Sequence, residues 1–169
     1  MNIAETYDYL IRARRDLWAA LESVPSEVLS RPLLGGEQFH CIKDLVFHVA
    51  TVEDGWLHLD ILRDEPVLKT TSALKDTGSG PVYAAFALST LLDYWQAVEQ
   101  RTSPYPDTLT GNELRQVVTV DDAPGERFTV DGLLWHVMIH EMRHTLQIAV
   151  LLRMQGVKSP SLDLLLSPI

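Results

Sequence analysis

Hydrophobic residues recur at steps of three and four positions in four segments of the chain, and this spacing predicts amphipathic helices. We expect helices over residues 2–24, 39–62, 81–102 and 130–156. Thr129 is a suitable N-cap for the last helix, because its hydroxyl can accept a backbone N–H of the first turn. Gly156 is a suitable stop, because glycine readily adopts the left-handed conformation that ends many helices. The pattern therefore predicts a chain built around four long helices.

Two regions between these helices break the helical pattern. Residues 64–80 predict a long loop, and Pro81 after it suits the first turn of the third helix. In residues 103–130, the short β-prone pieces QVVTV and ERFTV flank DDAPG, which predicts a small hairpin. The apolar tail, residues 157–169, is expected to pack along the bundle as a strap. The predicted fold class is all-α: a four-helix bundle in one domain over residues 1–169, with an irregular or hairpin segment before the last helix.

The composition is that of a globular protein, since 46% of the residues are apolar and 22% are charged. The net charge of −9 argues against nucleic-acid binding, which normally uses a basic surface. The longest uncharged apolar run is too short to span a membrane, and the N-terminus does not have the pattern of a signal peptide. Cys41 is the one cysteine, so no internal disulfide can form. We therefore expect a cytoplasmic protein that binds neither nucleic acid nor membrane.

Histidines form a row in the last predicted helix, within the apolar sequence LLWHVMIHEMRHTLQIAVLLRMQG. His140 and His144 are four residues apart, so their imidazoles lie one turn apart on one face and can bind one metal ion together. His136 extends the row by a turn, and spacing alone leaves the pair of His136 and His140 equally open. Arg143 and Gln147 flank the same sector and can line a pocket. Buried imidazoles in such surroundings require a metal, a polar network or a water-filled pocket.

The segment from His140 to His144 also matches H-E-x-x-H, the pattern of zinc proteases, in which the glutamate is the general base. The extended form of that motif requires a glycine and a histidine downstream, but Gln147 and Val150 occupy those positions. No glutamate follows Glu141 to act as a third ligand. A peptide-cleaving zinc enzyme is therefore disfavoured, and we expect Glu141 at the helix surface or in a salt bridge between helices.

A further histidine, His48, lies in the middle of the second predicted helix, in KDLVFHVATVEDGW. Bundles build metal sites from side chains on facing helices, so His48 is the best candidate for a third ligand. Asp44 precedes it by one turn and can orient the imidazole or a bound water. Gly55 falls near the same angular position two turns later and leaves space beside the ring. His40 and His58, near the two ends of this helix, can be solvent-exposed polar residues.

The segments HVMIHEMRHTLQIAVLLRMQG and DLVFHVATVEDGWL resemble the last-helix signature and the second-helix motif of the DinB/YfiT-like superfamily. The first shares two histidines four residues apart, a glutamine and an aliphatic run, and the second a histidine followed by an acidic and an aromatic residue. Most members carry Arg-Gly before the glutamine, where this chain has Thr145 and Leu146. The resemblance implies a four-helix bundle with one long crossover connection, usually a homodimer, and one divalent metal held by His48, His140 and His144.

Three imidazole nitrogens suit zinc and nickel alike. Members of the superfamily include transferases that use low-molecular-weight thiols. The resemblance therefore implies a metal-dependent enzyme that acts on a small-molecule substrate, either as an S-transferase with such a thiol or as a hydrolase. The alternatives are a stress-related metal-binding bundle without turnover and a plain bundle whose histidines hydrogen-bond to one another.

Overall fold

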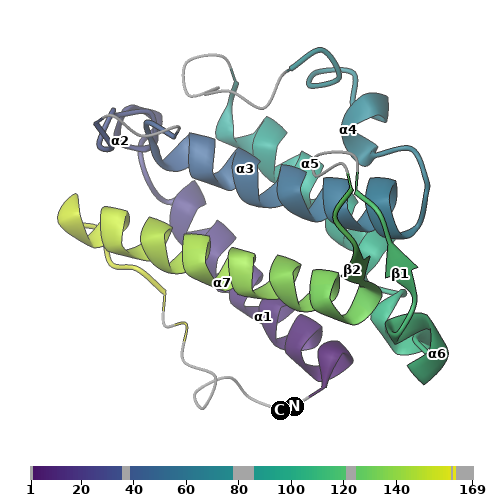
Figure 1. The fold of residues 1–169 in the computed structure, drawn as a ribbon. Coiled ribbons are helices and arrows are strands. Elements are labelled where there is room, and N and C mark those ends of the chain that lie inside the picture. The colour runs from purple at the N-terminus through teal and green to yellow at the C-terminus, as the bar shows by residue number, and fades with distance from the viewer. Residues whose placement is uncertain (1, 36–38, 78–85, 121–124, 161, 163–169) are drawn as a thin grey trace.

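The computed structural model describes residues 2–35, 39–77, 86–120, 125–160 and 162. Four long helices pack together as a bundle (Figure 1). They are α1 (Ile3–Glu22), α3 (Ile42–Asp54), α5 (Leu88–Thr102) and α7 (Val130–Met154). The all-α four-helix bundle predicted from the sequence is confirmed.

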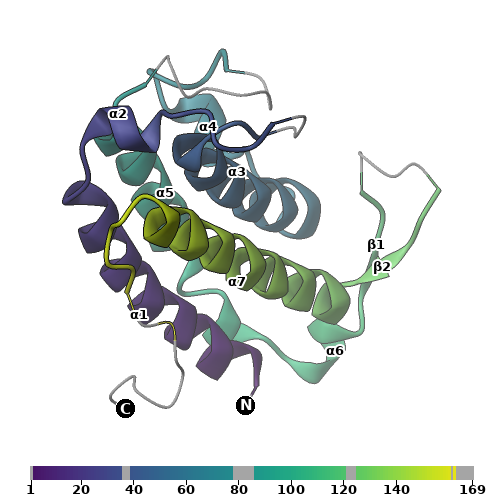
Figure 2. The same ribbon diagram turned by 90° about the vertical axis from the view of Figure 1, so that its left-hand side faces the viewer.

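Each of these helices packs against two others. α3 packs on α5 and α7, and α1 also packs on α5 and α7, so the four helices form a ring around the core. α3 continues directly into the π-helix η1 (Gly55–Ile61), which also contacts α7. In Figure 2 α7 runs between α1 and α3. This arrangement sets the middle of α3 against the middle of α7.

The beginning of α3 differs slightly from the predicted helix over residues 39–62. The helix begins at Ile42, and the carboxylate of Asp44 accepts the backbone N–H groups of His40 at 2.9 Å and Cys41 at 3.3 Å. An acidic side chain in the first turn satisfies N–H groups that have no partner within the helix. This capping fixes where α3 starts, and with it the position of the residues that follow.

The connection between α3 and α5 is not the plain loop predicted for residues 64–80. It contains the short helix α4 (Val67–Thr70), whose Val67 and Leu68 backbone N–H groups donate to the Asp54 carboxylate at 2.9 and 2.8 Å. A carboxylate from a distant helix thus replaces the local cap that α4 lacks. Because that partner lies 13 residues earlier for Val67, no local sequence pattern indicates this helix.

Two further boundaries differ from the predicted ones. The turn-rich stretch after α1 contains the short helix α2 (Ser26–Leu29). The third helix was predicted from residue 81, but α5 begins at Leu88 because Ala87 has an extended backbone, with φ of −66° and ψ of 148°. Pro81 itself lies outside the described residues.

The predicted hairpin before the last helix is confirmed. Strands β1 (Val117–Val118) and β2 (Phe128–Thr129) pair antiparallel, with Val117 opposite Thr129. β2 runs directly into α7, and the hydroxyl of Thr129 accepts the backbone N–H of Gly132 at 3.1 Å, as expected of an N-cap. Two short helices precede the hairpin: η2 (Pro106–Thr108) and α6 (Gly111–Leu114).

The end of α7 also follows the prediction. The helix ends at Met154, and Gly156 has the left-handed φ of +75° that favours glycine. Of the tail predicted to act as a strap, Val157 packs against the core and the Leu162 carbonyl accepts the hydroxyl of Tyr9. Residues 161 and 163–169 of that tail lie outside the described residues.

The core consists of two hydrophobic clusters. One includes Leu17, Leu21, Leu45, Trp95 and Ile148. The other includes Tyr7, Leu10, Leu57, Leu134 and Met138. Along α1 and α7, the buried polar residues Arg14, His140, Glu141 and His144 stand between these clusters in the sequence. Among the described helices, none combines the length and apolar content needed to cross a membrane.

Candidate metal centre

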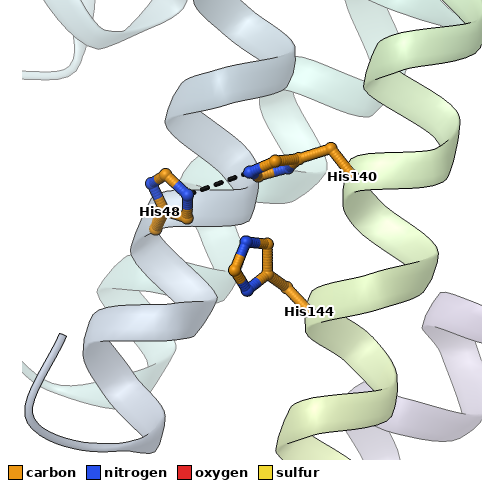
Figure 3. Close-up of side chains that lie close together, drawn as sticks. All are labelled: His48, His140 and His144. Carbon is orange, nitrogen blue, oxygen red and sulfur yellow. Dashed lines mark hydrogen bonds between the residues drawn. The ribbon is translucent and has the colours of Figure 1, made fainter. Parts of the chain in front are cut away.

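His48, His140 and His144 meet between α3 and α7 (Figure 3). One ring nitrogen from each histidine lies within 4.8 Å of the others. Nε2 of His48 and Nε2 of His140 are 2.9 Å apart, which is hydrogen-bonding distance. The structure therefore brings His48 together with the later pair of histidines on α7, one of the two pairs that spacing left open.

The surroundings of the cluster keep its imidazoles uncharged. Only 7% of the His140 surface and 8% of the His144 surface are exposed. Burial, together with the neighbouring His144, lowers the pKa of His140 to about 3 and that of His48 to about 4. Burial also lowers the pKa of His144, although its hydrogen bond to Gln147 acts in the opposite direction. At neutral pH all three are in the form that binds metals.

Two neighbours fix the orientation of the rings. Oε1 of Gln147 lies 3.0 Å from Nδ1 of His144, so that Nδ1–H can donate to the amide and Nε2 is left to face the cluster. The ring centroid of Phe39 lies 4.1 Å from that of His48 and 6.2 Å from that of His144. This role of Phe39 was not predicted, because a residue before α3 comes to lie beside α7 only in the fold.

Asp44, Arg143 and His136 were also proposed around the site, and each stands in a different relation to the cluster. Asp44 accepts the backbone N–H groups at the start of α3. Arg143 is exposed, and its Nη2 lies 3.3 Å from Nε2 of His144. His136 is also exposed, with its ring centroid 6.0 Å from that of His140 and 5.4 Å from that of Trp56. His136 therefore borders the cluster without being one of its three convergent imidazoles.

The three histidines fit a divalent cation. Nitrogen ligands around a tetrahedral zinc are about 3.3 Å apart, given zinc–nitrogen distances of about 2.0–2.1 Å. Small rotations of the present side chains would reach that spacing from separations that do not exceed 4.8 Å. Three protein ligands leave at least one coordination position for water or a substrate. Within the described part of the chain, the group that could hold an ion contains no carboxylate.

Glu141, the glutamate of the H-E-x-x-H pattern, points away from this chemistry. Its two carboxylate oxygens accept hydrogen bonds from Nε and Nη2 of Arg14, at 2.6 and 2.5 Å. These contacts form a buried salt bridge between α1 and α7. Arg14 also pairs with Glu53 on α3 at 2.7 Å and with Glu99 on α5 at 3.3 Å. Because Glu141 is fully engaged in this network, it is not available as the general base of a zinc protease.

The structure also places His58 and Gly55, two residues considered in the second predicted helix. His58, which was open to being a surface residue, is fully buried, and its Nδ1 lies 2.6 Å from Oδ1 of Asp54. A Cβ added to Gly55 would meet no described atom within 4 Å, so space exists there as expected. No close contact of a Cβ therefore requires glycine at this position.

Comparisons with known proteins agree with this architecture. The sequence matches the DinB family over residues 1–168. A DinB-like protein from Bacillus cereus ATCC 10987 is 16% identical and superposes with a TM-score of 0.62. The match covers 94% of this chain and 94% of that protein. YfiT from Bacillus subtilis, described as a probable metal-dependent hydrolase with an unusual four-helix bundle topology, is 17% identical and has a TM-score of 0.67. That match covers 92% of this chain and 89% of YfiT. No protein with a curated description matches the chain.

Proposed function

The chain belongs to the DinB family, and from that premise we propose that it is a metal-dependent enzyme acting on a small molecule. The observation that supports this proposal is the convergence of three uncharged imidazoles from α3 and α7. A closed structural site would use four protein ligands, whereas three leave room for a reactant. The description of YfiT as a probable metal-dependent hydrolase supports the same class of activity for this chain.

The chemistry follows from the donor set. A divalent metal, when bound, lowers the pKa of water or a thiol at its open position and so supplies a nucleophile near neutral pH. His48, His140 and His144 would hold the ion, and Gln147 would keep His144 in the tautomer that offers Nε2. Arg143 stands beside His144, where its charge can attract an anionic group of a reactant. Attack by water makes the enzyme a hydrolase, and attack by a low-molecular-weight thiol makes it an S-transferase.

Metal content is the first test. Protein purified without a histidine tag should contain about one zinc or nickel ion per chain by elemental analysis. His48→Ala should weaken metal binding by more than about a hundredfold, because loss of a ligand exceeds the cost of losing a residue behind it. His40→Ala is the matched control, since His40 lies outside the cluster. The absence of a stoichiometric metal, together with unchanged metal uptake by His48→Ala, would refute the proposal.

Activity separates the two nucleophiles. Hydrolysis of p-nitrophenyl acetate reports attack by water, and conjugation of cysteine to 1-chloro-2,4-dinitrobenzene reports attack by a thiol. At least one activity should disappear on chelation and return when zinc or nickel is added back. If a metal-loaded protein shows neither, the metal-binding bundle without turnover becomes the better account.

A further inference from the structure

An open pocket of about 590 Å³ adjoins the three-histidine cluster. Three segments that are far apart in the sequence line it: η1 with Trp56, the hairpin with Arg127 and Phe128, and the start of α7 with His136. The ring of His136 is 6.0 Å from that of His140, measured between centroids. A molecule in this pocket would therefore have the candidate metal centre as its neighbour.

Aromatic side chains form one corner of the pocket. The ring centroids of Trp56 and Phe128 are 6.4 Å apart with an interplanar angle of 78°, and those of Trp56 and His136 are 5.4 Å apart at 68°. The rings meet edge to face, and both Trp56 and Phe128 remain partly exposed. A corner of this kind suits a flat apolar group, which can lie against the face of one ring while its edge meets another.

Arg127 adds a positive charge to the same pocket. It is exposed, and no carboxylate among the residues that the structure places forms an ion pair with it. Asp131 lines a different pocket, beside the N-terminus of α1. The α7 N–H of Gly132 is already capped by Thr129, and among the described lining residues Arg127 is the one that carries a permanent positive charge. In a chain with a net charge of −9, an exposed arginine beside aromatic rings favours an anionic ligand.

We propose that this pocket binds the organic substrate of the proposed metal-dependent reaction, and that the substrate is a flat aromatic or unsaturated carboxylate. Trp56 and Phe128 would hold the flat group, and Arg127 would pair with the carboxylate. The reacting group would lie past His136, on the side of His140. The assignment as a substrate pocket rests on the proposed function, but the binding of such a ligand needs only the pocket.

Calorimetric titration of the chelator-treated protein tests the pocket without the metal. The probe is 2-naphthoate, and 2-naphthalenemethanol is its uncharged counterpart. We expect 2-naphthoate to bind about five- to tenfold more tightly than the alcohol, as an accessible charge-assisted contact allows. Arg127→Gln should remove this preference, and Trp56→Leu should weaken both ligands about tenfold. Arg12→Gln, which removes an exposed arginine from α1 outside the pocket, should leave the affinity unchanged.

The outcomes separate this proposal from the one on which it rests. Failure of 2-naphthoate to bind, equal affinity for the alcohol, or equal effects of Arg127→Gln and Arg12→Gln would each overturn the assignment of the pocket. Arg127 is exposed, so its variant is expected to fold, and its melting temperature checks this. If 2-naphthoate binds through Arg127 but the protein takes up no metal, the pocket assignment is supported and the metal-dependent function is refuted. If the protein binds a metal but not 2-naphthoate, the metal-dependent function is supported and the pocket assignment is refuted.

Discussion

A single hydrogen bond decides which nitrogen of His144 faces the cluster. Because Gln147 accepts from Nδ1, Nε2 carries the lone pair that a metal would bind, and Nη2 of Arg143 now lies 3.3 Å from it. Burial is the main cause that keeps all three imidazoles uncharged, and for His144 it outweighs the hydrogen bond to Gln147, which raises the pKa of that ring. Gln147 is thus a positioning residue: it touches a candidate ligand and not the reactants.

Replacement of Gln147 by leucine should weaken zinc binding by about ten- to a hundredfold, the usual cost of losing a group that orients a metal-bound histidine. Gln147→Glu should restore or exceed the wild-type affinity, because a carboxylate accepts the Nδ1–H more strongly. Competition titration against a zinc chelator measures both effects. A leucine variant with wild-type zinc affinity would show that packing alone orients His144.

The sequence predicted those parts of the candidate site whose geometry a single helix determines. The spacing of His140 and His144 and the central place of His48 follow from helical periodicity. Spacing did not distinguish His144 from His136, because both lie one turn from His140. Phe39 and the partnership of Arg14 with Glu141 were not predictable, since both depend on contacts between helices.

At the scale of elements, Asp54 joins three segments beyond the end of α3. Its carboxylate accepts from His58 in η1, from the backbone of Val67 and Leu68 in α4, and from the hydroxyl of Tyr94 on α5. Burial alone would raise the pKa of Asp54, but these hydrogen bonds outweigh burial and lower it. The four long helices were predictable because each has its own hydrophobic periodicity. α4 was not, because its first N–H groups are capped by Asp54, which lies outside its own sequence.

Asp54→Asn should reduce the free energy of unfolding at pH 7 by about 2 kcal/mol, because an amide cannot accept four donors as a carboxylate does. The folded-state pKa is lowered, so the contribution of this carboxylate is present above the unfolded pKa and is lost as pH falls through the folded value. The difference between variant and wild type should therefore shrink below about pH 4. Urea unfolding at several pH values measures it.

A matched variant makes this result interpretable. Tyr94→Phe removes one of the donors to Asp54 and leaves the carboxylate, so we expect a cost of about 1 kcal/mol. If Asp54→Asn cost as much at pH 3 as at pH 7, ionisation of the carboxylate would not be what holds η1, α4 and α5 together.

At the scale of the whole molecule, one arginine connects the four long helices. Arg14 on α1 pairs with Glu53 on α3, Glu99 on α5 and Glu141 on α7. Arg15, which is half-exposed, pairs with Glu99 as well. Two cations thus face three carboxylates, and burial raises the pKa of Glu141 while Arg14 opposes that effect. Along α1 and α7, Arg14 and Glu141 lie between the residues of the two hydrophobic clusters, and Glu141 directly follows His140 in the sequence.

We expect the fold to depend on Arg14, because three buried carboxylates share it as a partner. Arg14→Met should reduce the free energy of unfolding by about 3–5 kcal/mol, because it leaves three buried carboxylates without their shared partner. Arg12→Met, an exposed position on the same helix, should change it by less than about 0.5 kcal/mol. If Arg14→Met does not fold, the double variant Arg14→Met with Glu141→Leu should recover stability, because one buried charge is removed. Equal effects at Arg14 and Arg12 in chemical denaturation would mean that apolar packing alone holds the bundle together around the histidines.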